Sequence, residues 1–135
     1  MCFSCNIFLT MNISLLVSDQ IAEFFEVLSV PTRLGILLAI GEREVCVCHL
    51  EAVLHLRQAA ISQHLQRLKQ SQMVVARRQG RFVYYRLKDP QVLSFISDVA
   101  RMQGISSEQM DVFTRVPAEG CLCSLCNPQN EKNMC

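Results

Sequence analysis

The sequence predicts a mainly helical α+β fold, with four short helices before a β hairpin and one longer helix after it. Apolar residues recur at helical spacing up to residue 70, and the period of the pattern changes from about 3.6 to about 2 between Met73 and Leu87. The chain has 135 residues, of which 50% are apolar and 19% charged. That length suits a single core, and that composition excludes a disordered, highly charged protein.

The first two helices are predicted on either side of Pro31. Asp19 is a suitable N-cap for a helix that runs to Leu28. Pro31 suits the first turn of the next helix, which ends at Gly41. Residues 1–18 then form an N-terminal arm, whose apolar stretch is too short and too interrupted by polar residues to span a bilayer.

A pair of helices joined by a turn is predicted next. A short helix runs from about Cys46 to Leu54, a turn follows at His55, and a second helix covers Gln58 to Gln70. One face of the second helix is apolar and is formed by Ile61, Leu65 and Leu68. Its opposite face is polar and is formed by Gln58, Ser62, Gln66 and Lys69.

A β hairpin follows the helices. Two runs of β-branched and aromatic residues, Met73–Arg78 and Phe82–Leu87, flank a turn at Gln79–Arg81. In the second strand the alternation predicts a core-facing set, which is Val83, Tyr85 and Leu87. It also predicts an outward-facing set, which is Phe82, Tyr84 and Arg86.

A last long helix is predicted from Pro90 to about Met102, and it completes a domain at residues 19–102. Residues 103–135 form a C-terminal extension. A weaker helical pattern from Ser107 to Arg115 opens this extension. After Gly120 the periodicity is lost and the chain becomes a cysteine-rich tail.

The order of helix, turn, helix and basic hairpin is that of a winged helix-turn-helix with a two-stranded β-wing. The net charge of +1 conceals a segment from Ala52 to Lys88 that holds eight Lys or Arg and no acid. Such a basic block is typical of a face that binds a polyanion, here double-stranded DNA. An ordinary amphipathic helix with a solvated basic face is the alternative, and the hairpin and the lack of acids favour DNA.

The candidates for DNA contact lie on the second helix of the pair and on the hairpin. Gln and Ser on a helix can hydrogen-bond base edges in the major groove, and Arg beside a tight turn suits phosphate or minor-groove contact. The predicted contact residues are Gln58, Ala59, Ser62, Gln63, His64, Arg67, Lys69, Arg78 and Arg81.

Four segments resemble motifs of the ArsR/SmtB family of repressors. Residues 44–50, Glu-Val-Cys-Val-Cys-His-Leu, resemble the family's metal-binding box. Residues 60–65 and 80–87 are similar to its recognition helix and its wing, and residues 28–34 are similar to the opening of its second helix. The resemblance covers about residues 19–102. It implies a homodimer joined through its first and last helices, which binds an inverted-repeat operator until a metal or metalloid releases it.

Cys46 and Cys48 are the candidate ligands in this box, since two neighbouring thiolates favour soft ions. Residues i and i+2 of a regular helix point about 200° apart, so both sulfurs reach one ion only if the start of the helix is distorted. Two small buried hydrophobic residues are the alternative, and the family resemblance favours ligands.

The resemblance also leaves a donor missing. Some arsenic-sensing members carry a third Cys where this chain has Glu51, a poor substitute for sulfur. His49 stands where the family has Asp, and it is either a ligand for a borderline metal or, more often, a packing residue. The family's zinc site on the last helix needs His residues there, and this chain has none in that helix.

The third sulfur is expected from the tail, which holds Cys121, Cys123 and Cys126. These thiols either complete the Cys46 and Cys48 site, form a trigonal site of their own, or bind a structural zinc with Cys135. Cys2 and Cys5 are the other source and resemble arm cysteines of cadmium- and lead-sensing members. They would be lost if the natural chain starts at Met11. A disordered tail with incidental cysteines is the remaining alternative.

The sequence therefore predicts a transcriptional repressor and not an enzyme, because it has no glycine-rich cofactor loop and no Cys-x-x-Cys at a strand–helix junction. The expected effector is As(III) or Sb(III), ahead of Cd, Pb and Zn, and no organic cofactor is expected. A thiol redox-sensing repressor of the same fold is the alternative. No charged region of a signal peptide precedes the apolar stretch, so a cytoplasmic protein with reduced thiols and no membrane partner is expected.

Overall fold

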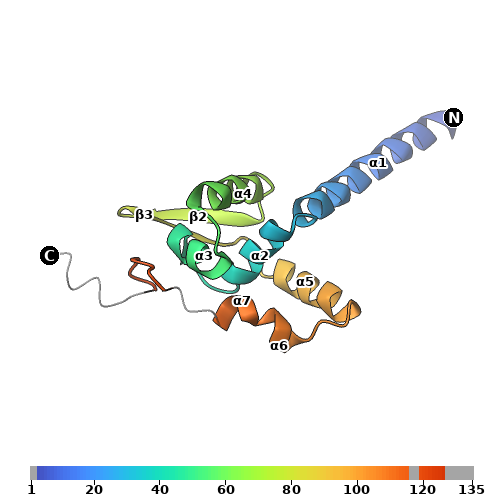
Figure 1. Cartoon of the computed structure of the whole chain (residues 1–135). Coiled ribbons are helices and arrows are strands. Elements are labelled where there is room, and N and C mark those ends of the chain that lie inside the picture. The colour runs from blue at the N-terminus through green and yellow to red at the C-terminus, as the bar shows by residue number, and fades with distance from the viewer. Residues whose placement is uncertain (1–2, 116–118, 127–135) are drawn as a thin grey trace.

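The computed structural model describes residues 3–115 and 119–126, with side chains from Ile13 onward. Its architecture is a winged helix-turn-helix (Figure 1). In chain order the elements are α1 (Phe3–Leu28), α2 (Pro31–Ile40), β1 (Val45–Cys46), α3 (Val47–Leu54), α4 (Gln58–Gln70), β2 (Val74–Gln79), β3 (Phe82–Leu87), α5 (Gln91–Met102), α6 (Ser107–Met110) and α7 (Val112–Arg115). The predicted mainly helical α+β fold and its β-wing are confirmed.

The core lies where α2, α3 and α4 pack against one another and against the sheet. The α4 side chains in this core are at most 1% exposed, and they are Ile61, Leu65 and Leu68. They form the apolar face predicted from the sequence. Truncating one such leucine to alanine costs about 2–5 kcal/mol. The orientation of α4 relative to α3 is therefore set by close packing.

The turn between α3 and α4 is made by His55, which adopts the left-handed conformation with φ 52° and ψ 37°. Arg57 then has extended dihedral angles as the N-cap of α4. The predicted position of the turn and both predicted ends of α4 are confirmed. The turn holds α3 and α4 as the helix pair of the helix-turn-helix.

The wing is the antiparallel hairpin of β2 and β3, in which Gln79 lies opposite Phe82. Gly80 and Arg81 form its two-residue turn, and Gly80 has a φ of 59°, which glycine adopts without strain. The hairpin and the position of its turn agree with the prediction.

β1 adds a third strand to the sheet, on the other edge of β3, with Cys46 opposite Tyr84. The sequence does not predict β1, because a strand of two residues has no alternation. Through this pairing the residue before α3 is connected directly to the wing.

The alternation predicted for β3 is wrong at Phe82, which is half-buried, and at Tyr84, which is buried. Leu87 is buried and Tyr85 packs against the main core as predicted, but Tyr84 is only 1% exposed instead of facing solvent. The tail covers that face of the sheet, and Tyr84 packs there in a second cluster with Cys46, Cys121 and Cys123. The alternation within β3 cannot predict that the tail covers this face, because the tail has no periodic pattern of its own.

α1 begins at Phe3, so the prediction that a helix starts at Asp19 is wrong. Residues 3–18 contain neither Pro nor Gly, and nothing in them interrupts a helix. The expected N-terminal arm is continuous with α1, which projects from the body of the protein (Figure 1). Within residues 3–115 and 119–126, none of the helices combines the length and apolar character that crossing a bilayer requires.

The C-terminal extension begins with two short helices instead of one helical segment. Ser106 caps α6 by accepting a hydrogen bond from the backbone N–H of Gln109. Asp111 then separates α6 from α7. α7 packs against α2, and residues 119–126 lie against the face of the sheet that carries Tyr84.

Candidate metal centre and nucleic-acid interface

Three thiols meet where β1, α3 and the tail come together. Cys46 is the last residue of β1 and the N-cap of α3, and Cys48 lies in the first turn of that helix. The sulfurs of Cys46 and Cys48 are 3.0 Å apart. The sulfur of Cys121 lies 3.2 Å from that of Cys46 and 3.3 Å from that of Cys48. The three sulfurs form a nearly equilateral triangle, to which the tail contributes one corner.

No distortion of a helix is needed to bring Cys46 and Cys48 together. α3 begins at Val47, and Cys46 has extended dihedral angles of φ −89° and ψ 169°. The opposed directions of residues i and i+2 do not apply, because Cys46 stands before the helix. The prediction that both sulfurs converge only through a distorted helix start is therefore wrong.

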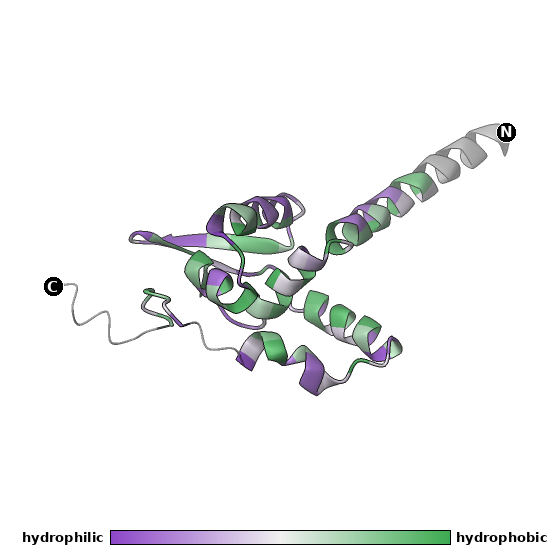
Figure 2. Ribbon diagram, viewed as in Figure 1, coloured by the Kyte–Doolittle hydropathy of each residue, from purple (hydrophilic) through white to green (hydrophobic). Residues whose placement is uncertain are grey.

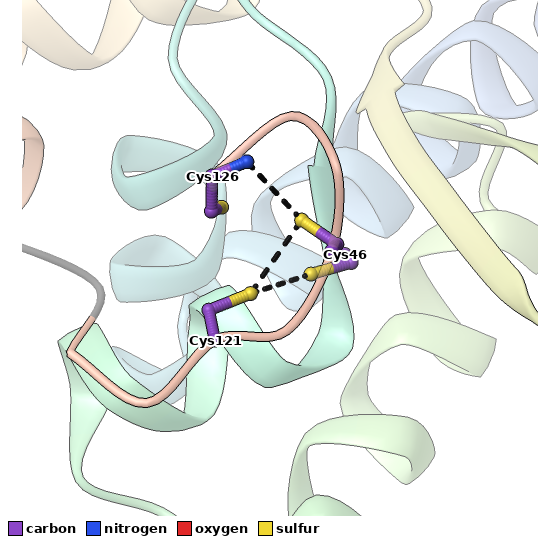
Figure 3. Close-up of side chains that lie close together, drawn as sticks. Cys46, Cys121 and Cys126 are labelled. Atoms are coloured by element: carbon purple, nitrogen blue, oxygen red, sulfur yellow. Dashed lines mark hydrogen bonds between the residues drawn. The ribbon is translucent and has the colours of Figure 1, made fainter. Parts of the chain in front are cut away.

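Two further tail thiols, those of Cys123 and Cys126, lie close to this triangle. The sulfur of Cys123 lies 3.5 Å from that of Cys121. The sulfurs of Cys46, Cys121, Cys123 and Cys126 all lie within 4.8 Å of one another. Figure 3 shows Cys46 facing Cys121 and Cys126, which the tail carries over the β1–α3 junction. All five candidate cysteines thus lie together within one chain.

The pKa values of these thiols are governed mainly by burial. Burial raises the pKa of Cys46 far above that of an ordinary thiol, and it also raises the pKa of Cys121 and of Cys126. At Cys123 burial acts in the same direction, but hydrogen bonds from the Cys126 backbone N–H and from neighbouring thiols outweigh it and lower the pKa. A thiol must lose its proton to bind a metal, so occupation of this cluster requires proton release.

His49 lies between Arg43 and the tail. Burial, and then the positive charge of Arg43, lower the pKa of His49, which favours the neutral ring. Nε2 lies 3.2 Å from the Arg43 guanidinium, and Nδ1 lies 3.1 Å from the sulfur of Cys126. Because arginine can only donate, Nε2 accepts, and the ring proton sits on Nδ1. His49 therefore donates a hydrogen bond to the Cys126 sulfur.

A second surface is formed by α4 and the wing. Figure 2 shows that the outer face of α4 and the tip of the wing are hydrophilic. The exposed candidates for DNA contact are Gln58, Ala59, Ser62, Gln63 and Lys69 on α4, with Arg78 and Arg81 at the wing tip, and His64 is half-buried. The exposed polar side chains of α4 stand opposite its buried apolar face, as a helix that presents side chains to a groove requires.

Comparisons with known proteins agree with this architecture. Residues 30–75 match the model of the family described as bacterial regulatory proteins of the arsR family. A probable mercury resistance operon repressor from Streptomyces lividans is 35% identical over 104 residues, which are 76% of this chain and 82% of that protein. The chain belongs to the ArsR family.

Other members of the ArsR family match over shorter stretches. The transcriptional repressor SmtB homolog of Synechocystis sp. is 40% identical over 62% of this chain and 63% of its own length. The arsenical resistance operon repressor of Escherichia coli is 44% identical over 48% of this chain and 56% of its own length. The chain therefore spans less than two thirds of the length of these two relatives.

Solved structures of the family share the fold. The homodimeric winged helix-turn-helix DNA-binding domain of a possible ArsR-family regulator from Mycobacterium bovis is similar with a TM-score of 0.60 and 28% identity. The similarity covers 66% of this chain and 82% of that domain.

Some predicted residues of this ArsR-family chain lie away from both surfaces. Arg67 of α4 faces α1, with its guanidinium 3.6 Å from a Glu26 carboxylate oxygen and 3.9 Å from one of Glu23. Glu51 is half-buried on α3 and is not among the described group of converging donors. Cys2 and Cys135, and the side chain of Cys5, lie outside the described part of the chain.

Sequence reasoning missed two residues that lie against the thiol cluster of this chain. Arg43 sets the tautomer of His49, and Tyr84 of β3 packs against the cysteines of the cluster. Arg43 lies just before the box and carries no motif of its own. Strand alternation places Tyr84 in solvent. Neither residue has a local signal that points to the cysteines.

Proposed function

We propose that this protein is a homodimeric transcriptional repressor, released from an inverted-repeat operator when As(III), Sb(III) or another soft ion binds to Cys46, Cys48 and Cys121. The observation that carries this proposal is the triangle of three sulfurs, whose sides are 3.0, 3.2 and 3.3 Å. Soft thiolates select soft ions. A trivalent metalloid binds three ligands in a trigonal pyramid, on the side opposite its lone pair. Three convergent thiolates without a hard donor fit that requirement.

The names of the relatives agree with a soft effector. One matched repressor belongs to an arsenical resistance operon and another to a probable mercury resistance operon. Both elements are thiophilic. The tail supplies the sulfur that the box lacks at Glu51, which explains how a three-thiolate site is assembled without a third cysteine in α3.

The position of the triangle supports a coupling to DNA binding. Cys46 and Cys48 flank the start of α3, and α3 packs against α4. Cys46 is also paired with Tyr84 of the wing. When the three thiolates bind one ion, the relative positions of the start of α3, the wing and the tail become fixed. These fixed positions bias the orientation of α4 and the wing, which is the change a repressor needs for release.

DNA binding is supported by the exposed polar face of α4 and the basic wing. Gln63 and Ser62 have side chains that can hydrogen-bond base edges, and Arg78 and Arg81 suit the phosphate backbone. Arg67 forms ion pairs with Glu23 and Glu26 of α1, so in the unbound protein it joins α4 to α1. Only a small number of α4 side chains therefore carry sequence recognition.

Dimerisation is supported by apolar surface on α1 and α5. Ile21 and Phe25 of α1 are each 53% exposed, and Val99 of α5 is 41% exposed. An open, apolar cavity of about 580 Å³ lies between these helices and is lined by Phe25, Phe95 and Val99 among others. Apolar surface of this kind is covered in a stable protein, and a second copy of the chain presents the same two helices.

Release from the operator tests the proposal. The full chain is bound to duplex operator DNA under reducing conditions and titrated with arsenite, and release is measured by fluorescence anisotropy. Cys48→Ser, or truncation after Ala118, should keep operator binding and lose release. Leu125→Ala, which alters an exposed side chain of the tail without removing a sulfur, is the matched control and should respond like the original chain. Normal release in the Cys48→Ser variant would show that the inducing site lies elsewhere.

A thiol redox switch is the second candidate function, because the sulfurs of Cys46 and Cys121 are 3.2 Å apart although 75 residues separate them. A peroxide would take two electrons from these thiols, which would form a disulfide and lose two protons, while the peroxide is reduced to two molecules of water. Mass spectrometry separates the two functions. Release with a mass loss of two hydrogen atoms and no bound ion supports redox sensing, whereas release with a bound ion supports metalloid sensing.

A further inference from the structure

Cys123 and Cys126 are not part of the triangle formed by Cys46, Cys48 and Cys121, although they converge on the same place. The sulfurs of Cys46, Cys121, Cys123 and Cys126 all lie within 4.8 Å of one another. Thiolates held about 2.3 Å from a tetrahedral Zn²⁺ are about 3.8 Å apart. Small movements of these four side chains are enough to surround such an ion, and Cys48 takes no part in that arrangement.

Backbone hydrogen bonds favour thiolates in this second set. The N–H of Cys126 donates to the sulfur of Cys123 over 3.3 Å, as the spacing Cys-x-x-Cys allows. The N–H of His49 donates to the sulfur of Cys46 over 3.4 Å in the same i to i+3 relation. Each bond offsets part of the negative charge that a sulfur gains when it loses its proton. The chain therefore prepares both sulfurs as ligands.

His49 completes the second set as a hydrogen-bond donor and not as a ligand. Its Nδ1–H points at the Cys126 sulfur, 3.1 Å away, because Arg43 occupies Nε2. If Nδ1 bound a metal, the ring proton would have to move to Nε2, where it would face the N–H groups of Arg43. The sulfurs of Cys46, Cys123 and Cys126 thus each receive an N–H hydrogen bond. A backbone hydrogen bond from Cys123 acts in the same way on Cys121.

We propose that the cluster contains two overlapping sites that share Cys46 and Cys121. The three-thiolate set is completed by Cys48 and takes a trivalent metalloid. The four-thiolate set is completed by Cys123 and Cys126 and takes a divalent ion of tetrahedral preference, such as Zn²⁺ or Cd²⁺. Because two sulfurs belong to both sets, one ion excludes the other. The three-thiolate half rests on the proposed function, and the four-thiolate half does not depend on operator release.

The test uses the full chain under reducing conditions, with Cd²⁺ and arsenite as the probes. Cadmium binding is followed by the ultraviolet charge-transfer absorbance of its thiolate bonds, and arsenite binding by native mass spectrometry. Cys48→Ser should leave both the Cd²⁺ affinity and the absorbance per ion unchanged, while it abolishes arsenite binding. Cys126→Ser should do the reverse, with Cd²⁺ affinity lowered by more than about 100-fold. Cys46→Ser should lose both ions.

A competition experiment completes the test. Arsenite added to the Cd²⁺-loaded protein should displace one Cd²⁺ for each metalloid bound, so that the total never exceeds one ion per chain. Two outcomes would overturn the proposal: equal loss of Cd²⁺ binding in Cys48→Ser and Cys126→Ser, or simultaneous binding of both ions. If arsenite binds as expected but the operator is not released, the proposed function fails while the two overlapping sites stand.

Circular dichroism of each variant, together with operator binding without ions, shows that it is folded. His49→Phe provides a further variant in which every sulfur is kept. Loss of the donor to Cys126 should lower Cd²⁺ affinity by about 10- to 100-fold and leave arsenite binding unchanged. A fall in both affinities would indicate a general structural role for His49 and would count against its place in the four-thiolate set.

Discussion

The guanidinium of Arg77 lies over the ring of Tyr84, its cross-strand partner, with Cζ 5.3 Å from the ring centroid. The same guanidinium donates to Glu44 over 2.6 Å. The Tyr84 ring packs against the thiol cluster, and its hydroxyl lies 3.4 Å from that of Ser124 in the tail. Tyr84 therefore contacts the candidate effector site and a basic residue of the wing at once, and it connects the state of the tail with the charge that the wing presents.

Glu44→Gln should tighten binding to any duplex by about 0.5 to 1 kcal/mol. Glu44 pairs with Arg77, and its carboxylate also lies 4.0 Å from Arg86. The hydrogen bond from Arg77 lowers the pKa of Glu44, so the carboxylate is charged at neutral pH. Without this charge, both arginines lose their acidic partner and are attracted more strongly to phosphates. Glu42→Gln removes the same charge from an exposed neighbouring position and should change little. Fluorescence anisotropy with operator and random DNA measures the effect, and an equal gain in both variants would exclude the specific role of Glu44.

Gln63→Ala should weaken operator binding by about 1 to 3 kcal/mol and leave binding to random DNA nearly unchanged. An exposed side chain on α4 that reads a base edge contributes only at the correct sequence. Arg78→Gln with Arg81→Gln should instead weaken all duplexes alike and reduce the salt dependence of log K by about 2. Titrations at several salt concentrations distinguish the two. Equal losses on operator and random DNA for Gln63→Ala would contradict the role of α4.

Val99→Asp should convert the proposed dimer into a folded monomer and lower operator affinity by about 100-fold or more, because two linked half-sites are no longer bound together. The substitution places a charge on the apolar surface that α5 presents beside Phe25. Ser94→Asp adds the same charge to another side of α5 and should leave the dimer intact. Analytical ultracentrifugation gives the oligomeric state, and circular dichroism confirms folding. A dimeric Val99→Asp variant would move the interface elsewhere.

The ion-free protein should lose stability as the pH rises above about 8.5, where thiols of the unfolded chain lose their protons. Burial raises the pKa of Cys46, Cys121 and Cys126 in the folded state, so the folded chain holds protons that the unfolded chain has released. The free energy of unfolding then falls with pH. The lowered pKa of Cys123 has the opposite effect on the pH dependence of stability, but it is one thiol against the three whose pKa is raised.

Urea denaturation in the presence of a reductant, near neutral pH and above about pH 9, measures this dependence. The matched control replaces Cys121, Cys123 and Cys126 with Ser, which removes the tail thiols from the balance. Its stability should depend less on pH in this range. Identical pH profiles for the control and the original chain would show that the cluster is not the source.

Much of the fold follows from the sequence alone. Ile61, Leu65 and Leu68 repeat at helical spacing, and the strands around Gly80 alternate, so α4 and the wing are determined by patterns that lie within a few residues of each other. Cys46 and Cys48 are likewise only two positions apart, so this part of the candidate site is visible as a motif. These features depend on local conformational preference and on which side chains must leave water.

The tertiary structure decided the other half. Cys121 reaches Cys46 across 75 residues, through a tail that has no periodicity, and no local pattern encodes that approach. The same tail buries Tyr84, against the alternation of its own strand. Arg43 determines the proton position on His49 only because folding places their side chains 3.2 Å apart. A sequence shows which donors exist, whereas their distances depend on how the whole chain packs, and distance decides which donors can share an ion.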